Sequence, residues 1–246
     1  MMLLTDDSWE VRKTSKKGRG IFAKKDIDAG LVIGDYIGRV IRTAEEETYE
    51  GDNGLYLMYY HDRASLYPTD IKAAGVHLIN NSCTPNCWIY TYKGHTLFFA
   101  IRHIFAGEEL TVPYLLSPLD KFCDPCPHTC HCEGVICTKS MHMSQERYDK
   151  WDKFNDAQAK ETKRARVRYG HELPKLASYP PAIPDDPIYV LFGSAGKPAK
   201  VLLDKKLPPN NKMRDLIRQS GLTLEFPALN KRVLGIQDQV IVSEEM

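Results

Sequence analysis

Cysteine is the residue type whose spacing in this sequence most directly indicates chemistry. All seven cysteines fall between positions 83 and 137. Three of them follow a Cys-x-Cys-x4-Cys pattern, which places three thiolates within reach of one loop: Cys130, Cys132 and Cys137. Tetrahedral zinc needs four ligands, so a fourth must come from elsewhere, and Cys83 and Cys87 are both candidates. Because tight cysteine clusters in a reducing compartment bind metal more often than they form disulfides, the pattern predicts structural zinc.

Three other segments carry residues suited to a binding or catalytic site. In Lys17-Gly18-Arg19-Gly20 the two glycines let the backbone pass close to a ligand. The small and polar residues 80–87 follow an apolar pair and form a loop that lies on the surface or lines a polar pocket. Residues 107–114 resemble the end of a strand that delivers the hydroxyl of Tyr114 just before the chain turns away. Each segment alone is also compatible with an ordinary turn, a surface loop or a core tyrosine.

Length and composition set the class of protein. The 246 residues allow one large domain, or a domain of about 140 residues with an appendage. A hydrophobic fraction of 43% supports a real core, and a net charge of +1 gives no global attraction to nucleic acid or anionic lipid. No apolar run approaches the roughly 20 residues that cross a bilayer, and the first residues are too few and too acidic for a secretion signal. We therefore expect an intracellular protein without membrane contact.

The elements that must position the candidate residues indicate a mainly β domain. Stretches 9–13, 31–41 and 96–101 are rich in Val, Ile, Trp, Tyr and Phe, with glycines between them, which predicts short strands. Few stretches of the first 115 residues show helical periodicity, and brief helices are expected at 43–50 and 68–74.

Residues 21–30 and 98–107 form an internal echo. Five positions are identical at an offset of 77, so that Phe22, Ala23, Ile27, Ala29 and Gly30 match Phe99, Ala100, Ile104, Ala106 and Gly107. Both copies read as strand, tight turn and strand. Two copies are too few for a solenoid, and the echo predicts a β domain assembled from paired hairpin units.

The second half of the chain predicts one long helix and a small appendage. Residues 144–169 form the long helical candidate, and a Pro-rich linker follows. Further elements are expected in order along the rest of the chain: a hairpin at 188–192 and 199–204, a short helix at 211–219, and apolar runs at 222–226 and 238–243. The basic residues from Lys160 to Arg168 read as a solvated helix face, with nucleic-acid or nucleosome contact as the alternative.

Taken together and in this order, these segments resemble the SET-domain protein-lysine methyltransferases with a post-SET zinc-binding motif. Four stretches carry the resemblance: Gly18-Arg19-Gly20-Ile21-Phe22, Asp35-Tyr36-Ile37-Gly38, residues 79–86 and residues 109–114. The third resembles the Asn-His-Ser-Cys-x-Pro-Asn signature of the family and the fourth its Glu-Leu-Thr-x-x-Tyr signature. The match covers roughly residues 9–139, and the ordered set is highly specific.

The resemblance implies a mainly β, β-clip-like SET fold with knot-like threading, one of the rare exceptions to unknotted chains. It divides the chain into a SET domain at 1–120, a post-SET zinc-binding motif at 121–142, a long helix at 143–173 and a small α+β appendage at 188–246.

The same resemblance implies methyl transfer from S-adenosylmethionine to a protein lysine. The cofactor would be held by Lys17, Gly18, Arg19, Gly20, Tyr36, Asn80, Asn81 and Tyr114. Tyr114 would stand where the two substrates meet, and Tyr56 would line the lysine channel. One zinc ion would be bound by Cys83, Cys130, Cys132 and Cys137, joining the flap to the active-site loop. The partner would be a protein presenting a lysine, with a histone tail as the commonest family expectation, and the location would be the nucleus for a histone substrate and the cytoplasm otherwise.

The chain departs from the family pattern at four positions: Asn81 replaces the signature His, Pro113 precedes the tyrosine, His77 stands where Arg is frequent, and Val112 replaces a common aromatic residue. The departures at Asn81 and Pro113 leave a catalytically silent SET module that binds a protein tail as the alternative. Cys123 and Cys126 also lie outside the pattern, as spare thiols, alternative ligands or part of a second site. Histidines such as His128 and His142 are expected at the surface or at caps, with a role as additional metal ligands as the alternative.

Overall fold

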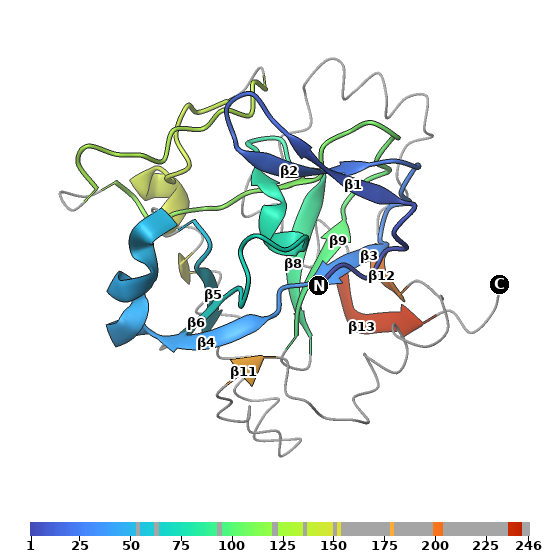
Figure 1. The fold of residues 1–246 in the computed structure, drawn as a ribbon, viewed down its shortest axis with the longest axis horizontal. Helices are drawn as coiled ribbons and strands as arrows, with labels where there is room; N and C mark the ends of the chain where they lie inside the picture. Colours follow the sequence, from blue (N-terminus) through green and yellow to red (C-terminus); the bar gives the residue numbers. More distant parts are fainter. Residues whose placement is uncertain are drawn as a thin grey trace.

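The computed structural model shows a mainly β protein with small sheets and few helices (Figure 1). The residues that the structure describes are 1–52, 55–61, 64–92, 95–119, 123–134, 137–149, 152–153, 178–179, 199–203 and 236–242. Residues 9–112 contain most of the described strands and are called the β domain below. The expected mainly β class is therefore confirmed.

An antiparallel hairpin forms the first part of the β domain. It consists of β1 (Trp9–Lys13) and β2 (Arg19–Ala23), paired from Trp9 with Ala23 to Lys13 with Arg19. The turn closes through a hydrogen bond of 2.7 Å from the Thr14 N–H to the Gly18 carbonyl. Gly18 has a φ of 72°, a left-handed conformation that favours glycine. The hairpin therefore holds the predicted Lys17–Gly20 turn at a defined place beside β2.

Two small sheets follow the hairpin. One has the order β3 (Val32–Asp35), β9 (His95–Ala100) and β8 (Cys87–Tyr92), and the other joins β4 (Gly38–Arg42), β6 (Ala64–Tyr67) and β5 (Met58–His61). The stretch predicted as one strand at 31–41 is thus two strands, which belong to different sheets. The chain changes sheet at Tyr36, and Gly38 then lies so close to the Tyr67 carbonyl that a Cβ atom would collide with it.

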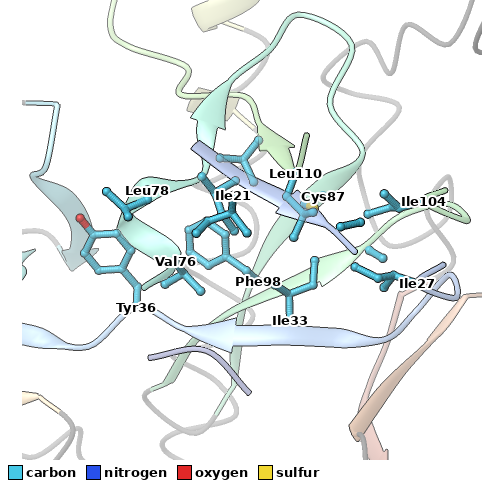
Figure 2. Packing of buried hydrophobic residues seen from close by; sticks show 14 of the residues in the cluster. Ile21, Ile27, Ile33, Tyr36, Val76, Leu78, Cys87, Phe98, Ile104 and Leu110 are labelled. Carbon is cyan, nitrogen blue, oxygen red and sulfur yellow. The ribbon is translucent and has the colours of Figure 1, made fainter. Parts of the chain in front are cut away.

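The core lies between these sheets and the hairpin. Phe98 lies near the middle of the cluster in Figure 2, and Ile21, Ile33 and Leu110 pack around it; all four are at most 1% exposed. Full burial of such side chains contributes roughly 1.5–3 kcal/mol each. Tyr36 lies at one edge of the cluster, and its hydroxyl points away from the other labelled side chains (Figure 2). The Tyr36 hydroxyl therefore marks the polar edge of the apolar core.

The two copies of the internal echo pair with each other. Ile27 and Ile104 exchange backbone hydrogen bonds of 2.8 and 2.9 Å. The Gly30 N–H donates to the Ala100 carbonyl and the Gly107 N–H to the Ala23 carbonyl, both at 2.7 Å. The two glycines have φ values of 84° and 90°. The echo thus corresponds to two similar turns that exchange equivalent hydrogen bonds.

Two brief helices were expected. The first is present, and the prediction of the second is wrong. Residues Thr43–Asp52 form the 3-10 helix η1, which covers the expected stretch 43–50. Residues 68–74 form turns instead, because the Asp70 side chain accepts the Lys72 N–H at 2.8 Å and competes with a helical hydrogen bond. A short 3-10 turn, η2 (Val76–Leu78), follows.

The rest of the chain is described only in part. Helical residues are present at 145–149 and 152–153, within the expected helix at 144–169, whose remainder lies outside the described residues. β11 (Ser178–Tyr179) pairs with β4, and β12 (Ala199–Leu203) pairs with β13 (Ile236–Val242). The expected segments 188–192, 211–219 and 222–226 lie outside the described residues. Within the described part of the chain, no helix is long and apolar enough to span a membrane.

Candidate active site and metal centre

A parallel strand pair brings together two segments that the sequence marked as candidates. β7 (Asn80–Asn81) pairs with β10 (Thr111–Val112). The buried side chain of Asn86 strengthens this pairing, since its Nδ2 donates to the Glu109 carbonyl and its Oδ1 accepts from the Thr111 N–H, each at 2.8 Å. The loop 80–86 and the segment 109–114 therefore lie side by side.

The Lys17–Gly20 turn meets the same place. Asn80 Nδ2 donates to the Arg19 carbonyl at 3.0 Å and to Glu109 Oε1 at 2.8 Å. The Lys17 ammonium forms an ion pair with the other oxygen of Glu109, and both side chains are less than a fifth exposed. A Cβ atom on Gly20 would lie 2.6 Å from Glu109 Oε1 and 2.8 Å from Asn80 Nδ2. Any larger residue at position 20 would therefore displace the Glu109 carboxylate and the Asn80 amide from these positions.

Tyr114 lies at the end of β10, beside both segments. Its backbone N–H donates to Asn81 Oδ1 at 2.8 Å, and its hydroxyl donates to the Ile79 carbonyl at 3.2 Å. Burial, helped by the neighbouring Tyr56 and Glu109, raises the pKa of the Tyr114 phenol well above its ordinary value. The phenol therefore stays neutral and can act as a hydrogen-bonding dipole throughout the physiological pH range.

Two further tyrosines surround this phenol. The Tyr36 hydroxyl donates to the Tyr56 carbonyl at 2.7 Å, and its ring stacks on Phe98 with a centroid separation of 6.0 Å. Burial, followed by the nearby phenols of Tyr114 and Tyr56, raises the pKa of Tyr36. The three candidate tyrosines thus form one aromatic and partly apolar environment, in which a charged amine would lose solvation.

His77 also belongs to this environment. From the sequence alone it was identified only as a departure from the family pattern. Its ring packs edge-on against Tyr56, with centroids 5.9 Å apart. Nε2 is buried, and among the described residues it has no hydrogen-bond partner. Burial, together with the nearby Arg19 charge, lowers the pKa of His77, so the imidazole is neutral at pH 7. No spacing rule in the sequence would have identified this contact.

Four cysteines gather beside the loop 80–86. The Sγ atoms of Cys83, Cys130, Cys132 and Cys137 all lie within 4.8 Å of one another. Cys83 Sγ and Cys130 Sγ are 3.7 Å apart, and two thiolates on one tetrahedral zinc ion would be about 3.8 Å apart for Zn–S bonds of about 2.3 Å. The donor set and its spacing therefore fit a structural zinc ion. Cys83, rather than Cys87, supplies the fourth sulfur.

The electrostatics of the group also suit a metal. Hydrogen bonds from Cys130 and Cys83 lower the pKa of the Cys132 thiol far below its ordinary value, while hydrogen bonds with Cys132 and Cys83 raise the pKa of the Cys130 thiol, so one negative charge shared by these sulfurs is favoured on Cys132. Cys87 differs from these cysteines, because it is fully buried in the core and burial raises the pKa of its thiol to about 12. An inert core thiol and a metal-binding thiol are thus distinguished by their surroundings.

Asn81 connects the cysteine group to Tyr114. Its Nδ2 donates to Cys130 Sγ at 3.2 Å, while its Oδ1 accepts the Tyr114 N–H. The side chain is 6% exposed, so both hydrogen bonds are shielded from water. An amide in place of the signature imidazole therefore has a structural role here, independent of any contact with a cofactor.

The cysteine-rich segment (residues 116–143) also contacts Lys16, the residue before the Lys17–Gly20 turn. Lys16 Nζ and Glu133 Oε1 form an exposed ion pair of 3.1 Å. In Figure 1 this segment, in green to yellow, lies outside the sheets of the β domain. Cys123 and Cys126 are not part of the four-cysteine group; they gather with His128 and His142, which were expected at the surface or at caps. The Cys-x2-Cys-x-His spacing from 123 to 128 was the signal that would have found this second group.

Comparison with known proteins shows a similarity that covers most of the β domain. Residues 18–115 match the family model of the SET domain. The human protein named histone-lysine N-methyltransferase 2B is 31% identical over 150 residues, which are 54% of this chain and 5% of that protein.

Two further relatives have comparable similarity. The Drosophila pseudoobscura pseudoobscura protein named histone-lysine N-methyltransferase Su(var)3-9 is 35% identical over 153 residues, 52% of this chain and 24% of that protein. The Arabidopsis thaliana protein named histone-lysine N-methyltransferase ASHH3 is 32% identical over 145 residues, 55% of this chain and 38% of that protein. This chain thus spans well under half the length of each of these relatives.

Proposed function

We propose that this chain, which carries a SET domain at residues 18–115, transfers a methyl group from S-adenosylmethionine to the side chain of a protein lysine. The observation that carries the proposal is the meeting of the Lys17–Gly20 turn, the loop 80–86 and Tyr114 at one place. The knot-like threading and the post-SET role of residues 121–142 remain predictions from the resemblance.

The residues at this place suit the cofactor. A Cβ atom on Gly18 would meet no atom within 4 Å, so the turn has an open side at which a ligand can reach its backbone. Eight residues would hold the cofactor: Lys17, Gly18, Arg19, Gly20, Tyr36, Asn80, Asn81 and Tyr114. When bound, S-adenosylmethionine supplies the methyl group on a positively charged sulfonium.

The protein's own contribution begins with the protonation state of the substrate. The attacking lysine must be neutral, yet its free pKa is about 10.4. An environment formed by Tyr36, Tyr56 and Tyr114 disfavours the charged ammonium and lowers that pKa. A dedicated general base is then not required, because water can remove the proton before the amine attacks.

Alignment and electrostatics complete the proposed mechanism. The rigid strand pair β7–β10 would hold the reacting atoms in a near-attack geometry, which can account for much of the rate. The neutral Tyr114 hydroxyl, fixed by the Ile79 carbonyl, and nearby carbonyl groups would stabilise the polarised methyl group. Tyr56 would line the channel through which the lysine enters.

The four-cysteine group would hold one zinc ion that shapes the flap over this site. Metal binding provides folding free energy to segments that bury little apolar surface. The Asn81 side chain links Cys130 to the backbone of Tyr114 by two hydrogen bonds. We therefore assign the zinc a structural role, in which it completes the channel and does not take part in the chemistry.

The three relatives described above are named histone-lysine methyltransferases, so we propose a protein substrate that presents a lysine, with a histone tail as the first candidate. Contact with nucleosomal DNA would depend on the basic residues from Lys160 to Arg168, which lie outside the described residues. A histone substrate would place the protein in the nucleus.

The test is incorporation of labelled methyl groups from S-adenosylmethionine into a mixture of histones and ribosomal proteins, followed by mass spectrometry of the modified lysines. Wild type should label lysine, and Tyr114→Phe should label it far more slowly. Tyr59→Phe is the matched control, because Tyr59 is 65% exposed and lies outside the site. A zinc-replete wild type that binds a protein tail but transfers no methyl group would support the silent binding module instead.

A further inference from the structure

The cysteine-rich segment contains a second group of metal-binding side chains. Sγ of Cys123 and Cys126, Nδ1 of His128 and Nε2 of His142 all lie within 4.8 Å of one another. We propose that these four residues bind a second zinc ion in a Cys2His2 site. This inference goes beyond the proposed methyl transfer and does not depend on it.

The distances within the group match those around one tetrahedral ion. Cys123 Sγ lies 3.5 Å from Cys126 Sγ, 3.2 Å from His128 Nδ1 and 3.5 Å from His142 Nε2. Cys126 Sγ lies 3.9 Å from His128 Nδ1, and the two histidine nitrogens are 3.1 Å apart. Bond lengths typical of zinc give separations of about 3.8 Å between two sulfurs, about 3.6 Å between sulfur and nitrogen and about 3.3 Å between two nitrogens. One ion therefore fits at the centre of all four.

Contacts around the group prepare its members as ligands. His142 Nδ1 lies 2.6 Å from the Ser117 carbonyl, which can only accept, so Nδ1 carries the proton. In the neutral ring Nε2 then presents a lone pair to the other three residues. Histidine ligands in metal sites commonly donate their second ring nitrogen in this way. The His128 backbone N–H also donates to Cys126 Sγ at 3.4 Å, which orients this sulfur.

The chemistry of the donors points to zinc. Two thiolates and two imidazoles form one of the common structural zinc sets, whereas calcium and magnesium prefer oxygen ligands. A disulfide does not explain the group, because Cys123 and Cys126 form none in the described structure, and a disulfide would leave both histidines unaccounted for. A hydrogen bond between the two histidines would explain only the ring contact, without the convergence of both sulfurs.

The ligands of the two groups are interleaved along the chain, so a second ion would constrain the segment that carries the first. Three ligands precede the Cys130–Cys137 stretch, and His142 follows it. His142 also pairs with Leu116 in a parallel bridge, and the Met143 N–H donates to the Leu116 carbonyl at 2.9 Å. The second ion would therefore fasten both ends of the cysteine-rich segment to the chain that leaves Tyr114, and the first ion would hold its middle to the loop 80–86.

Zinc content measured by mass spectrometry tests the assignment on the full chain purified with bound metal. Wild type should contain two zinc ions per chain, and Cys123→Ser/Cys126→Ser and Cys130→Ser/Cys132→Ser should each contain one. His131→Gln and Cys87→Ala are matched controls that should keep two, since these residues belong to neither group. One ion in wild type, or two in Cys123→Ser/Cys126→Ser, would overturn the proposal.

X-ray absorption at the zinc edge gives a second measurement that does not depend on the folding of any variant. Two sites, one with four sulfurs and one with two sulfurs and two nitrogens, give an average of about three sulfurs and one nitrogen per zinc. An all-sulfur environment in wild type would show that Cys123, Cys126, His128 and His142 bind no zinc. Neither measurement depends on methyl transfer. A failure of the proposed activity and a failure of the second zinc site would therefore be distinguishable.

Discussion

The β domain and the cysteine-rich segment differ in what they bury. The β domain buries aromatic and branched aliphatic side chains in one cluster, with Phe98, Ile21 and Ile33 at most 1% exposed (Figure 2). In the described part of residues 116–143, the buried hydrophobic residues are Cys130 and Met143. The first region can therefore fold by burial of apolar surface, whereas the second needs another source of stability, and its two groups of Cys and His side chains indicate metal binding.

The candidate site lies where these two regions meet. Tyr114 follows β10 by two residues, and its backbone N–H donates to Asn81, which also donates to Cys130 of the segment. One site can thus depend both on the burial of apolar surface in the β domain and on metal binding in the cysteine-rich segment. The predictions below separate them, beginning with the largest expected effect.

Removal of zinc should abolish methyl transfer while the β domain stays folded. A strong chelator would release the cysteine-rich segment, but the apolar core does not contain a metal ligand. Hydrogen exchange should show fast exchange at residues 116–143 and continued protection of β2, β3 and β9. Added zinc should restore activity. Unchanged turnover in zinc-free protein would contradict the structural role of the metal.

Phe98→Ala should produce the opposite pattern. Loss of a fully buried ring from the centre of the core should lower the free energy of unfolding by about 3–5 kcal/mol. Zinc content per folded molecule should remain as in wild type. Urea denaturation measures the change, and Leu119→Ala, at a side chain that is 58% exposed, should stay within about 0.5 kcal/mol of wild type. Equal effects of the two substitutions would refute this view of the core.

Tyr114→Phe should lower kcat by about 10²–10³-fold, the range seen when one well-placed hydrogen-bonding group is removed from an active site. Stability and zinc content should change little, because the ring remains and only the hydroxyl contact with the Ile79 carbonyl is lost. Steady-state kinetics and calorimetric titration of S-adenosylmethionine should show a larger loss in turnover than in cofactor affinity. A fully active variant would remove Tyr114 from the mechanism.

Asn81→Ala should weaken the junction between the two regions. It removes the acceptor for the buried Tyr114 N–H and the donor to Cys130 Sγ, and such losses cost about 1–3 kcal/mol. We expect reduced turnover with the β domain folded. Asn81→Asp keeps an acceptor for Tyr114 but has no amide donor, so a difference between the two variants reports the contact with the cysteine group. Wild-type kinetics in both would show that the junction does not matter.

The smallest effect concerns pH. Burial lowers the folded-state pKa of His77, so the unfolded chain binds a proton that the folded chain resists. Stability from this group is complete above pH 6.5, the ordinary histidine value, and is lost progressively as the pH falls below it. His77→Gln should reduce the slope of unfolding free energy against pH between about 6.5 and 5. Denaturation of both proteins at several pH values would show it, and an identical slope would contradict it.

Sequence patterns predicted the segments that carry chemistry better than the elements between them. The glycine turn, the asparagine loop and Tyr114 are compact motifs, and the structure brings all three together. The four-cysteine group, with Cys83 as its fourth member, also follows the predicted set. These residues were recognisable because each motif is short and its spacing has a specific chemical meaning.

What the sequence did not predict depends on contacts between distant residues. The strand expected at 31–41 divides because Tyr36 leaves one sheet and Gly38 packs against Tyr67 in another. The helix expected at 68–74 fails because one aspartate side chain captures a backbone N–H. Cys130, Cys132 and Cys137 of the first group lie between Cys123 and His142 in the sequence. The place of His142 in the proposed second site is therefore not apparent from local sequence.

The parallel pairing of β7 with β10 has a consequence for synthesis on the ribosome. Asn80 and Asn81 emerge well before their partners at 111 and 112, and Ile27 must wait for Ile104. Contacts between such distant residues form slowly, so an incomplete nascent chain exposes the unpaired edge of β7 and the apolar side of β2. The cysteines at 123–137 emerge directly afterwards, so zinc bound at the proposed sites would hold the newly closed arrangement together.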